Sequence, residues 1–218
     1  MALEREREHV AAVSRRLADD GLVIGTGGNV SARLGDRVAI TATGAVLADA
    51  TAEQVTVIDL DGEVLDGELA PTSELALHLG VYRRYDAGAV VHTHAPMATA
   101  LSCVLDEVPC VHYQMLLLGG AVRVAPYRTF GTPELAEVVL DALDGRTAAL
   151  MANHGAIAHG PDLDKAFDAS QLLEWACTVY WRAAALGAPR ILDDEQRQAV
   201  VTAAMERNYG TTRPAEGE

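Results

Sequence analysis

Short segments rich in β-branched residues alternate with capped helical segments along the chain. The clearest β-rich case is VTVIDLDGEVL, where two such runs flank the pair Asp61-Gly62. An Asp-Gly pair between β-rich runs is typical of a tight hairpin, which joins antiparallel strands. The segment GLVIGTGGNVSARLGDRVAITATG has the same character, with short strands expected between glycine-rich turns. The alternation with helices predicts one layered α/β domain that contains antiparallel strands.

Capping residues and apolar spacing locate the first helices. One helix is predicted over residues 3–20, where the apolar residues of EREREHVAAVSRRL recur at helical spacing. In PTSELALHLGVYRRY, a helix is predicted to open near Thr72 or Ser73, with Glu74 in its first turn. Another is predicted in GTPELAEVVLDAL, with its threonine as N-cap and its proline at the first helical position.

The remaining segments complete an alternating pattern. AGAVVHTH is predicted to be a strand, and a helix is expected around APMATALSCVL. Residues 108–130 are expected to form irregular strands and turns. AALMANHGAIAHG is predicted to be two short strands that flank His154. Two helices, over residues 163–186 and 193–208, are expected to close the chain.

The size and composition fit one folded domain. The chain has 218 residues, 50% of them hydrophobic, which is enough to bury a sizeable core. We expect a single domain over residues 1–218, with a tail that is flexible from about residue 207. No apolar run approaches the roughly 20 residues needed to cross a bilayer, and MALEREREHV lacks the apolar stretch of a secretory signal. A soluble cytoplasmic protein is therefore expected.

Charge and residue usage exclude several classes of function. The formal net charge is −14. Nucleic acid and anionic membranes are therefore not expected as partners, because basic surfaces bind them. Lys165 is the only lysine and lies in the acidic segment PDLDKAFD, which argues against a lysine Schiff base. Cys103, Cys110 and Cys177 form no CxxC pair and are expected to be reduced thiols.

The histidines are the main candidates for chemistry. His92 and His94 end the apolar run of AVVHTHAP, and residues i and i+2 of a strand point to the same face. The two imidazoles can therefore converge on one ion, although a pair of hydrogen-bonded structural histidines is the alternative. His154 in MANHGAI would complete the three-ligand pattern of catalytic zinc sites. His78, four residues after Glu74, is expected to be structural or to support the site without binding the ion.

Several motifs occur in order and carry a family resemblance: GTGGNVSAR, TATG, PTSE, HTHAP, VHYQ with APYRTFGTPEL, and NHGAI. Together they resemble the class II sugar-phosphate aldolases, in particular the L-fuculose-1-phosphate aldolase type, over almost the whole chain. The resemblance implies a three-layer α/β/α fold with a mostly antiparallel central sheet. It also implies a homotetramer with active sites between subunits.

The resemblance assigns the metal and the catalytic groups. It implies one Zn²⁺ per subunit, with other divalent ions still open, held by His92, His94 and His154. Glu74 matches the acid that transfers a proton and that approaches the metal in the free enzyme as a candidate fourth ligand. Two tyrosines complete the catalytic set. Tyr113 matches a tyrosine that reaches in from a neighbouring subunit, and Tyr209 matches a tyrosine near the aldehyde half of the substrate.

A phosphate site without lysine is also implied. Read alone, GTGGNVS departs from GxGxxG and favours a tight structural turn. Glycine amides, hydroxyls and a helix start can nonetheless hold a dianion. The positions that match the family's phosphate site form three segments: Thr26, Gly28 and Asn29; Thr43 and Gly44; and Thr72 and Ser73. Ala42 stands where many relatives have proline and Thr72 replaces a common serine, and we expect phosphate binding to survive both changes.

The implied activity is that of a class II aldehyde-lyase. It would reversibly cleave a ketose 1-phosphate into dihydroxyacetone phosphate and a small aldehyde, through a metal-stabilised enediolate. The alternatives are 5-deoxypentulose-1-phosphate aldolase, methylthioribulose-1-phosphate dehydratase and L-ribulose-5-phosphate 4-epimerase. The epimerases typically have aspartate where this chain has Glu74. A non-catalytic scaffold resembling the adducin head domain would lack the metal site, so the retained histidines argue against it.

Overall fold

One nine-stranded sheet organises the computed structural model, which describes residues 3–207 and 209–210. The strand order is β4-β3-β2-β1-β5-β9-β8-β7-β6. The strands are β1 (Asn29–Leu34), β2 (Arg37–Thr41), β3 (Val55–Asp59), β4 (Val64–Asp66), β5 (Ala89–Thr93), β6 (Glu107–Val108), β7 (Val122–Ala125), β8 (Ala148–Met151) and β9 (Gly155–Gly160). The helices are α1 (Glu4–Asp19), α2 (Leu75–Arg84), α3 (Pro96–Ser102), α4 (Pro133–Ala142), α5 (Leu163–Leu186) and α6 (Asp194–Arg207). Short 3₁₀ segments are η1 (Leu47–Asp49), η2 (Ala52–Gln54) and η3 (Tyr113–Leu118).

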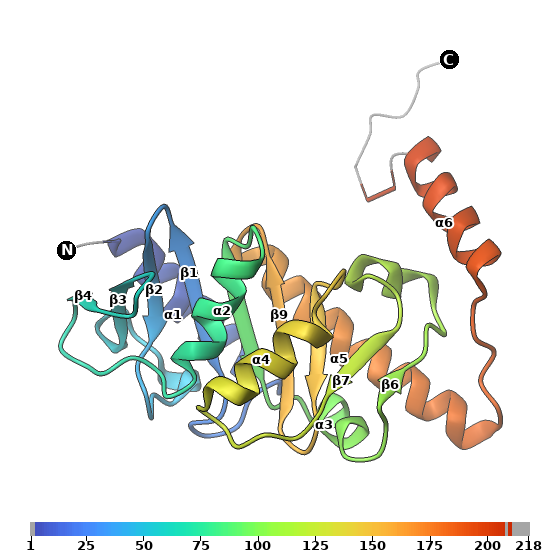
Figure 1. The fold of residues 1–218 in the computed structure, drawn as a ribbon, viewed down its shortest axis with the longest axis horizontal. Coiled ribbons are helices and arrows are strands. Elements are labelled where there is room, and N and C mark those ends of the chain that lie inside the picture. Colours follow the sequence, from blue (N-terminus) through green and yellow to red (C-terminus); the bar gives the residue numbers. More distant parts are fainter. Residues whose placement is uncertain (1–2, 208, 211–218) are drawn as a thin grey trace.

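Helices cover both faces of the sheet (Figure 1). Leu17 of α1 and Phe167 of α5 belong to the core on one face, whereas Leu79 of α2 belongs to the core on the other. Successive residues of β5 alternate between these cores, with Val91 in the first and Val90 in the second. The sheet therefore lies between two helical layers, as the expected α/β/α arrangement requires.

The sheet is mixed, with one parallel pair among antiparallel neighbours, where the resemblance implied a mostly antiparallel sheet. β7 and β8 run parallel, with Val124 opposite Leu150. The chain passes between them through α4, and such a helical crossover is what joins parallel neighbours. The predicted hairpin around Asp61-Gly62 is confirmed as the antiparallel pair β3 and β4, and the strands flanking His154 are confirmed as the antiparallel pair β8 and β9.

The start of α4 follows its local sequence. The Thr132 hydroxyl accepts a hydrogen bond from the backbone N–H of Leu135 at 3.2 Å, and Pro133 is the first helical residue. This pairing satisfies one of the N–H groups that a helix start leaves without a partner. The predicted cap and first residue of this helix are confirmed.

The start of α2 differs from its prediction. The helix begins at Leu75, and Glu74 takes the N-cap position instead of Thr72 or Ser73. The backbone N–H of Thr72 donates to the Thr41 carbonyl at 3.0 Å, so this residue extends the pairing at the end of β2. A residue held in extended pairing cannot enter the helix, and the first turn is therefore displaced to Leu75.

The last helix stands apart from the sheet (Figure 1). None of the described residues of α6 is buried, and its main neighbour is η3. Residues 208 and 211–218, which make up most of the tail that we expected to be flexible, lie outside the described residues. Among the helices described, none combines the length and apolar character needed to cross a membrane.

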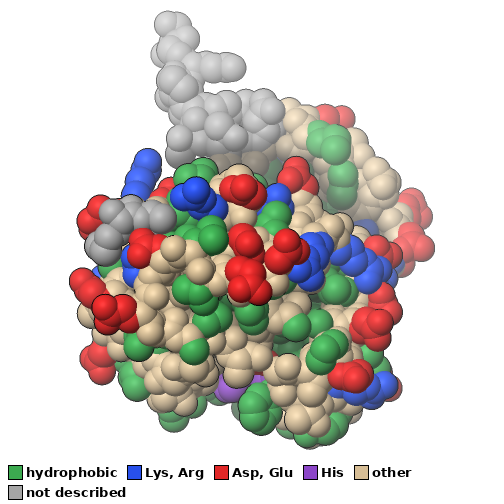
Figure 2. Space-filling model, turned by 60° about the vertical axis from the view of Figure 1, so that its left-hand side comes forward, with side chains coloured by type: hydrophobic (Ala, Val, Ile, Leu, Met, Phe, Trp, Pro, Cys, Tyr) green, Lys and Arg blue, Asp and Glu red, His purple; other side chains and the backbone are tan. Residues whose placement is uncertain are grey.

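Charged groups are distributed over the surface. On the face shown in Figure 2, basic side chains lie among acidic ones instead of forming a single stripe. Lys165 is exposed near the start of α5 and pairs with Asp168 at 3.2 Å. The only lysine therefore lies on the surface, as its acidic surroundings predicted.

Candidate metal centre and active site

Three imidazoles meet at the carboxyl end of β5. His92 is the penultimate residue of this buried strand, His94 follows directly after the strand, and His154 lies in the turn between β8 and β9. β9 pairs with β5, which brings the turn beside the two earlier histidines. One nitrogen from each ring lies within 4.8 Å of the others, and the Nε2 atoms of His92 and His94 are 3.1 Å apart. The structure thus brings together the three histidines that the sequence singled out.

Backbone geometry presents the third histidine. Asn153 has a positive φ of 55°, a conformation that asparagine adopts more readily than most residues with a side chain. The N–H of His154 then donates to the Met151 carbonyl at 3.1 Å and closes the turn. Gly155 follows where a Cβ atom would lie 2.3 Å from the Thr93 carbonyl oxygen. The tight approach of this turn to β5 therefore requires glycine.

Glu74 reaches the same place from the start of α2. Its Oε2 lies 3.0 Å from His92 Nε2, and its Oε1 lies 3.5 Å from His154 Nε2. Asn29, the first residue of β1, donates from Nδ2 to Oε2 at 3.0 Å. Oε1 is buried and has no hydrogen-bond partner. A buried carboxylate oxygen without a partner is costly, so this atom faces a place where another group belongs.

The donor set fits a divalent cation. His92 donates from Nδ1 to the Ala156 carbonyl at 2.8 Å, so in the neutral ring its Nε2 carries a lone pair. That lone pair faces Glu74 Oε2 and His94 Nε2, which also carry lone pairs. Acceptors gathered in this way repel one another unless a cation lies among them. Three neutral imidazoles that leave one coordination position open are the ligand pattern of catalytic zinc sites.

The protonation states of His94, His154 and Glu74 suit the binding of a metal ion. Burial, together with the nearby His92 and His154, lowers the pKa of His94 to about 4. Burial also lowers the pKa of His154, helped by His92. For Glu74, burial alone would raise the pKa, but the nearby His92, the hydrogen bond from Asn29 and the nearby His154 outweigh it and hold the pKa well below its usual range. At neutral pH the site therefore holds neutral His94 and His154 rings beside an ionised carboxylate, the states that bind metal.

A cavity of about 560 Å³ opens above these groups. Glu74, His94 and His154 contribute to its wall, while His92 lies fully buried beside them. The three segments expected to bind phosphate line the same cavity: Thr26, Gly28 and Asn29; Thr43 and Gly44; and Thr72 and Ser73. Segments far apart in sequence thus form one concave site.

Two glycines let the first of these segments approach the histidines. A Cβ atom on Gly27 would lie 2.7 Å from His94 Nδ1. Gly28 has a positive φ of 88°, and a Cβ atom there would lie 2.8 Å from the His92 carbonyl oxygen. Glycine adopts this conformation without steric cost, and no side chain fits in the space. The loop is therefore built against the histidine strand.

Comparison with known proteins identifies the family. The sequence profile of the family described as class II aldolase and adducin N-terminal domain matches residues 8–181. This chain belongs to the class II aldolase family. The 5-deoxy-D-ribulose 1-phosphate aldolase of Bacillus thuringiensis serovar kurstaki is 38% identical to this class II aldolase over 201 residues, which cover 91% of this chain and 94% of the relative. The L-fuculose phosphate aldolase of Escherichia coli K12 is 40% identical over 184 residues, which cover 83% of this chain and 85% of that relative.

A solved structure agrees with this membership. An L-fuculose 1-phosphate aldolase superposes on this class II aldolase with a TM-score of 0.89 and 34% identity, covering 94% of this chain and 98% of that chain. The family resemblance read from the sequence is confirmed, and the chain is an enzyme of the lyase class. Class II aldolases depend on a metal ion, and His92, His94 and His154 are able to hold one.

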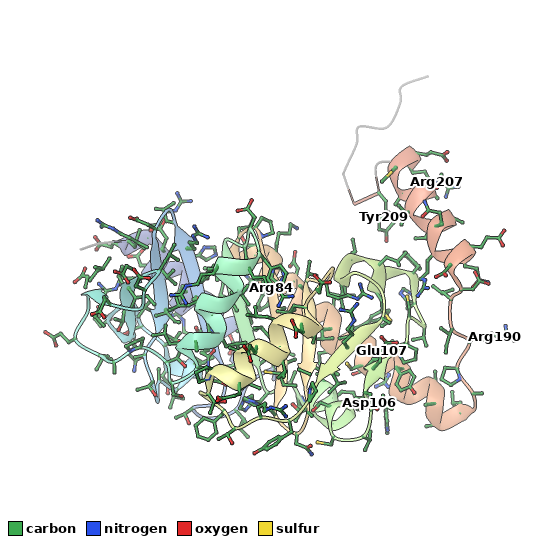
Figure 3. The ribbon with its side chains drawn as sticks, in the orientation of Figure 1. Arg84, Asp106, Glu107, Arg190, Arg207 and Tyr209 are labelled. Atoms are coloured by element: carbon green, nitrogen blue, oxygen red, sulfur yellow. The ribbon has the colours of Figure 1, made fainter. Side chains whose placement is uncertain are left out.

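The two predicted catalytic tyrosines lie elsewhere in the class II aldolase. The hydroxyls of Tyr113, at the start of η3, and Tyr209, just after α6, are 3.2 Å apart. Figure 3 shows Tyr209 at the end of α6, on the side that faces the rest of the molecule. Both tyrosines line an apolar groove between η3 and α6 and neither lines the histidine cavity. Within one chain, the structure therefore does not bring them to the metal centre.

The cavity wall also contains residues to which the sequence analysis gave no role. Tyr127, Arg128 and Phe130 enter it from the loop between β7 and α4, and Asn153 enters beside His154. The loop lies in the motif APYRTFGTPEL, but its turn-like sequence does not show which side chains face a ligand. The sequence signal that could have pointed to Arg128 as a binding residue is its permanent positive charge in an acidic chain.

Proposed function

We propose that this class II aldolase is a metal-dependent enzyme that reversibly cleaves a ketose 1-phosphate into dihydroxyacetone phosphate and a small aldehyde. The observation that carries the proposal is the convergence of three imidazoles and one carboxylate at a cavity rimmed by a glycine-rich loop. A metal centre beside a candidate phosphate site suits a phosphorylated substrate with a carbonyl group. The relatives named as sugar-phosphate aldolases support the same reaction type.

His92, His94 and His154 are the proposed metal ligands, one ion per chain. A divalent ion held there, zinc in our proposal, would polarise the substrate carbonyl and stabilise the negative charge that follows loss of a proton. Their nitrogen donors favour zinc, although other divalent ions bind imidazole as well. The ring of His92 is oriented for this role by its hydrogen bond to Ala156.

Glu74 is the proposed proton acceptor. Asn29 and His92 already contact Oε2, whereas Oε1 has no hydrogen-bond partner. In our proposal, Oε1 takes the proton from the substrate carbon next to the carbonyl and returns it in the cleavage direction. The carboxylate also remains a candidate fourth ligand when no substrate is bound.

Phosphate binding is assigned to the loop and the helix start. Residues 26–29 line the cavity together with Thr43, Thr72 and Ser73. The Gly27 amide already donates to the Ile24 carbonyl at 3.0 Å, so the proposed neutral donors are the amides of Thr26 and Gly28 and the three hydroxyls. Such donors hold a dianion without lysine. The N-terminus of α2 adds a favourable dipole at Thr72 and Ser73.

Tyr113 and Tyr209 are proposed to act across a subunit interface. Both are partly exposed and lie outside the cavity of their own chain. In a homotetramer with sites between subunits, Tyr113 would reach the aldehyde oxygen in a neighbouring site, and Tyr209 would lie near the aldehyde half. We also propose that each subunit is one domain that works in the cytoplasm, where its unpaired cysteines stay reduced.

The substrate is proposed to be L-fuculose 1-phosphate or a 5-deoxypentulose 1-phosphate. The relatives named for these two substrates are 40% and 38% identical to the chain. Each candidate ketose phosphate is incubated with the enzyme, and triose phosphate is detected with a coupled dehydrogenase. Release of triose phosphate supports an aldolase, whereas its absence with a changed sugar phosphate favours dehydratase or epimerase chemistry.

Metal removal and Glu74→Gln test the mechanism. Chelation should abolish cleavage, and restored Zn²⁺ should recover it. Glu74→Gln keeps the shape but removes the proton acceptor, so cleavage should fall by at least about 100-fold. Full activity in a metal-free sample would contradict the proposal, and the absence of stoichiometric metal in the purified protein would favour a scaffold.

A further inference from the structure

A continuous line of buried hydrogen bonds runs from Glu74 into the sheet. Asn29 Nδ2 donates to Glu74 Oε2 at 3.0 Å, and Asn29 Oδ1 lies 2.5 Å from His78 Nε2. Ser31 Oγ lies 2.7 Å from His78 Nδ1 and 2.6 Å from the Tyr82 hydroxyl. The four residues behind Glu74 are between 0% and 6% exposed. Bulk water therefore does not compete for His78, Ser31 and Tyr82, while Asn29 borders the cavity.

The sequence spacing of two elements creates this line. Asn29 and Ser31 are two residues apart in β1, so their side chains lie on the same face of the sheet. His78 and Tyr82 are four residues apart in α2, so they lie on the same side of the helix. α2 packs over this face, and the four side chains alternate between strand and helix.

Donor and acceptor chemistry gives the line one direction. An ionised Glu74 only accepts, so it requires the NH₂ end of the Asn29 amide and leaves the carbonyl end for His78. His78 must then donate from Nε2, and a neutral ring that donates there accepts at Nδ1. Burial lowers the pKa of His78 to about 3, which keeps the ring neutral at pH 7. Ser31 therefore donates to His78 and accepts from the Tyr82 hydroxyl.

We propose that His78, Ser31 and Tyr82 are positioning residues that lock the Asn29 amide with its NH₂ group toward Glu74. If the amide turned end for end, its carbonyl oxygen would face the carboxylate, and two acceptors would repel each other. The lock holds Oε2 beside His92 and leaves Oε1 free toward the cavity. The inference rests on the proposed function, because it explains how the proposed proton acceptor is held.

The tautomer of His78 tests the line without any turnover. In zinc-loaded protein with ¹⁵N-labelled histidine, long-range ¹H–¹⁵N spectra at pH 7 should show His78 protonated at Nε2 and not at Nδ1. The side-chain NH₂ of Asn29 should exchange slowly with solvent, and Ser31→Ala should speed that exchange. A His78 ring protonated at Nδ1, or a rapidly exchanging Asn29 amide in the unaltered protein, would overturn the proposal.

Two substitutions at His78 separate the donor from the bulk of the ring. Glutamine can place an NH₂ group near the position of Nε2, whereas methionine fills the space without a donor. His78→Met should lower kcat for ketose phosphate cleavage by about 10- to 100-fold with little change in KM, and His78→Gln should keep most of kcat. Equal kcat values for the two variants would contradict a role for the donor.

A pair of serine variants controls for general destabilisation. Ser31→Ala and Ser170→Ala make the same change at two buried serines, and the Ser170 hydroxyl donates only within α5, to the Ala166 carbonyl. Ser31→Ala should lower kcat several-fold, while Ser170→Ala leaves it unchanged; equal losses would overturn the proposal. If the unaltered enzyme cleaves no ketose phosphate, the proposed function fails, and the His78 tautomer still decides whether the line exists.

Discussion

Glu74 Oε2 lies 3.0 Å from His92 Nε2, where the His92 side chain is fully buried and the carboxylate almost so. Since His92 donates from Nδ1 to the Ala156 carbonyl, Nε2 is the nitrogen left for an ion or a proton. The proposed base and a proposed metal ligand are therefore in direct contact. A change in either group should alter both metal binding and proton transfer.

Metal binding should stabilise the folded protein through the three imidazoles. Adding Zn²⁺ to metal-free protein at 100 times the dissociation constant should raise the free energy of unfolding by about 2.7 kcal/mol. His94→Ala removes one ligand and should lose most of that gain in thermal melts. His9→Ala is the control, since His9 lies outside the histidine cluster and should keep the full gain. An equal gain in both variants would refute the assigned ligands.

Gly28→Ala should damage the loop more than a matched glycine change. Gly28 and Gly35 both have positive φ, but only Gly28 has the His92 carbonyl oxygen 2.8 Å from the added Cβ position. Gly35→Ala should cost about 1–2 kcal/mol, the cost of a left-handed conformation. Gly28→Ala should cost about 1–3 kcal/mol more, because it adds a clash. Urea unfolding measures both, and equal costs would show that the close approach is unimportant.

Arg128 should strengthen the binding of an anionic substrate. Among the described residues that line the cavity, it is the one with a permanent positive charge. Arg128→Gln should raise KM for a ketose 1-phosphate about three- to tenfold and weaken the dependence of kcat/KM on salt. Arg128→Lys should keep KM and the salt dependence of kcat/KM close to those of the unaltered enzyme. Arg37→Gln, an exposed change in β2, is the control, and the same response from it would rule out a local role.

Acid should destabilise the protein partly through His78. Burial lowers the pKa of His78 from 6.5 to about 3. Between these values the unfolded chain binds a proton that the folded protein does not, so the free energy of unfolding falls as pH falls. From pH 6.5 to 4.5 this residue should account for about 2–3 kcal/mol. Urea unfolding of His78→Gln should show a shallower fall with pH, and an unchanged slope would contradict the assignment.

Local signals predicted the elements whose contacts are local. The Asp61-Gly62 hairpin and the Thr132 cap depend on residues within a few positions of one another, and both were predicted correctly. The start of α2 was predicted too early, because Thr72 pairs with Thr41, which is distant in sequence. The parallel pairing of β7 and β8 was not predicted for the same reason, since no local sequence pattern shows which strands become neighbours in the sheet.

The candidate site could be predicted because its motifs carry family information. Spacing placed His92 and His94 together, and the motif MANHGAI suggested His154 as a third ligand. The resemblance added the phosphate segments, which the fold brings to the same cavity. Arg128 was missed because a loop sequence does not show where a side chain points. Tyr113 and Tyr209 stay predictions, since their assigned roles depend on a second subunit.

Asn29 is the direct partner of His92 across the β1–β5 ladder. Because side chains alternate along a strand, sliding β1 by a single residue would turn Asn29 to the opposite face of the sheet. Correct strand alignment and assembly of the catalytic groups are therefore one event. A folding intermediate with misaligned strands should have no activity. The rate at which activity returns during refolding should therefore report the rate at which β1 and β5 pair in the correct register.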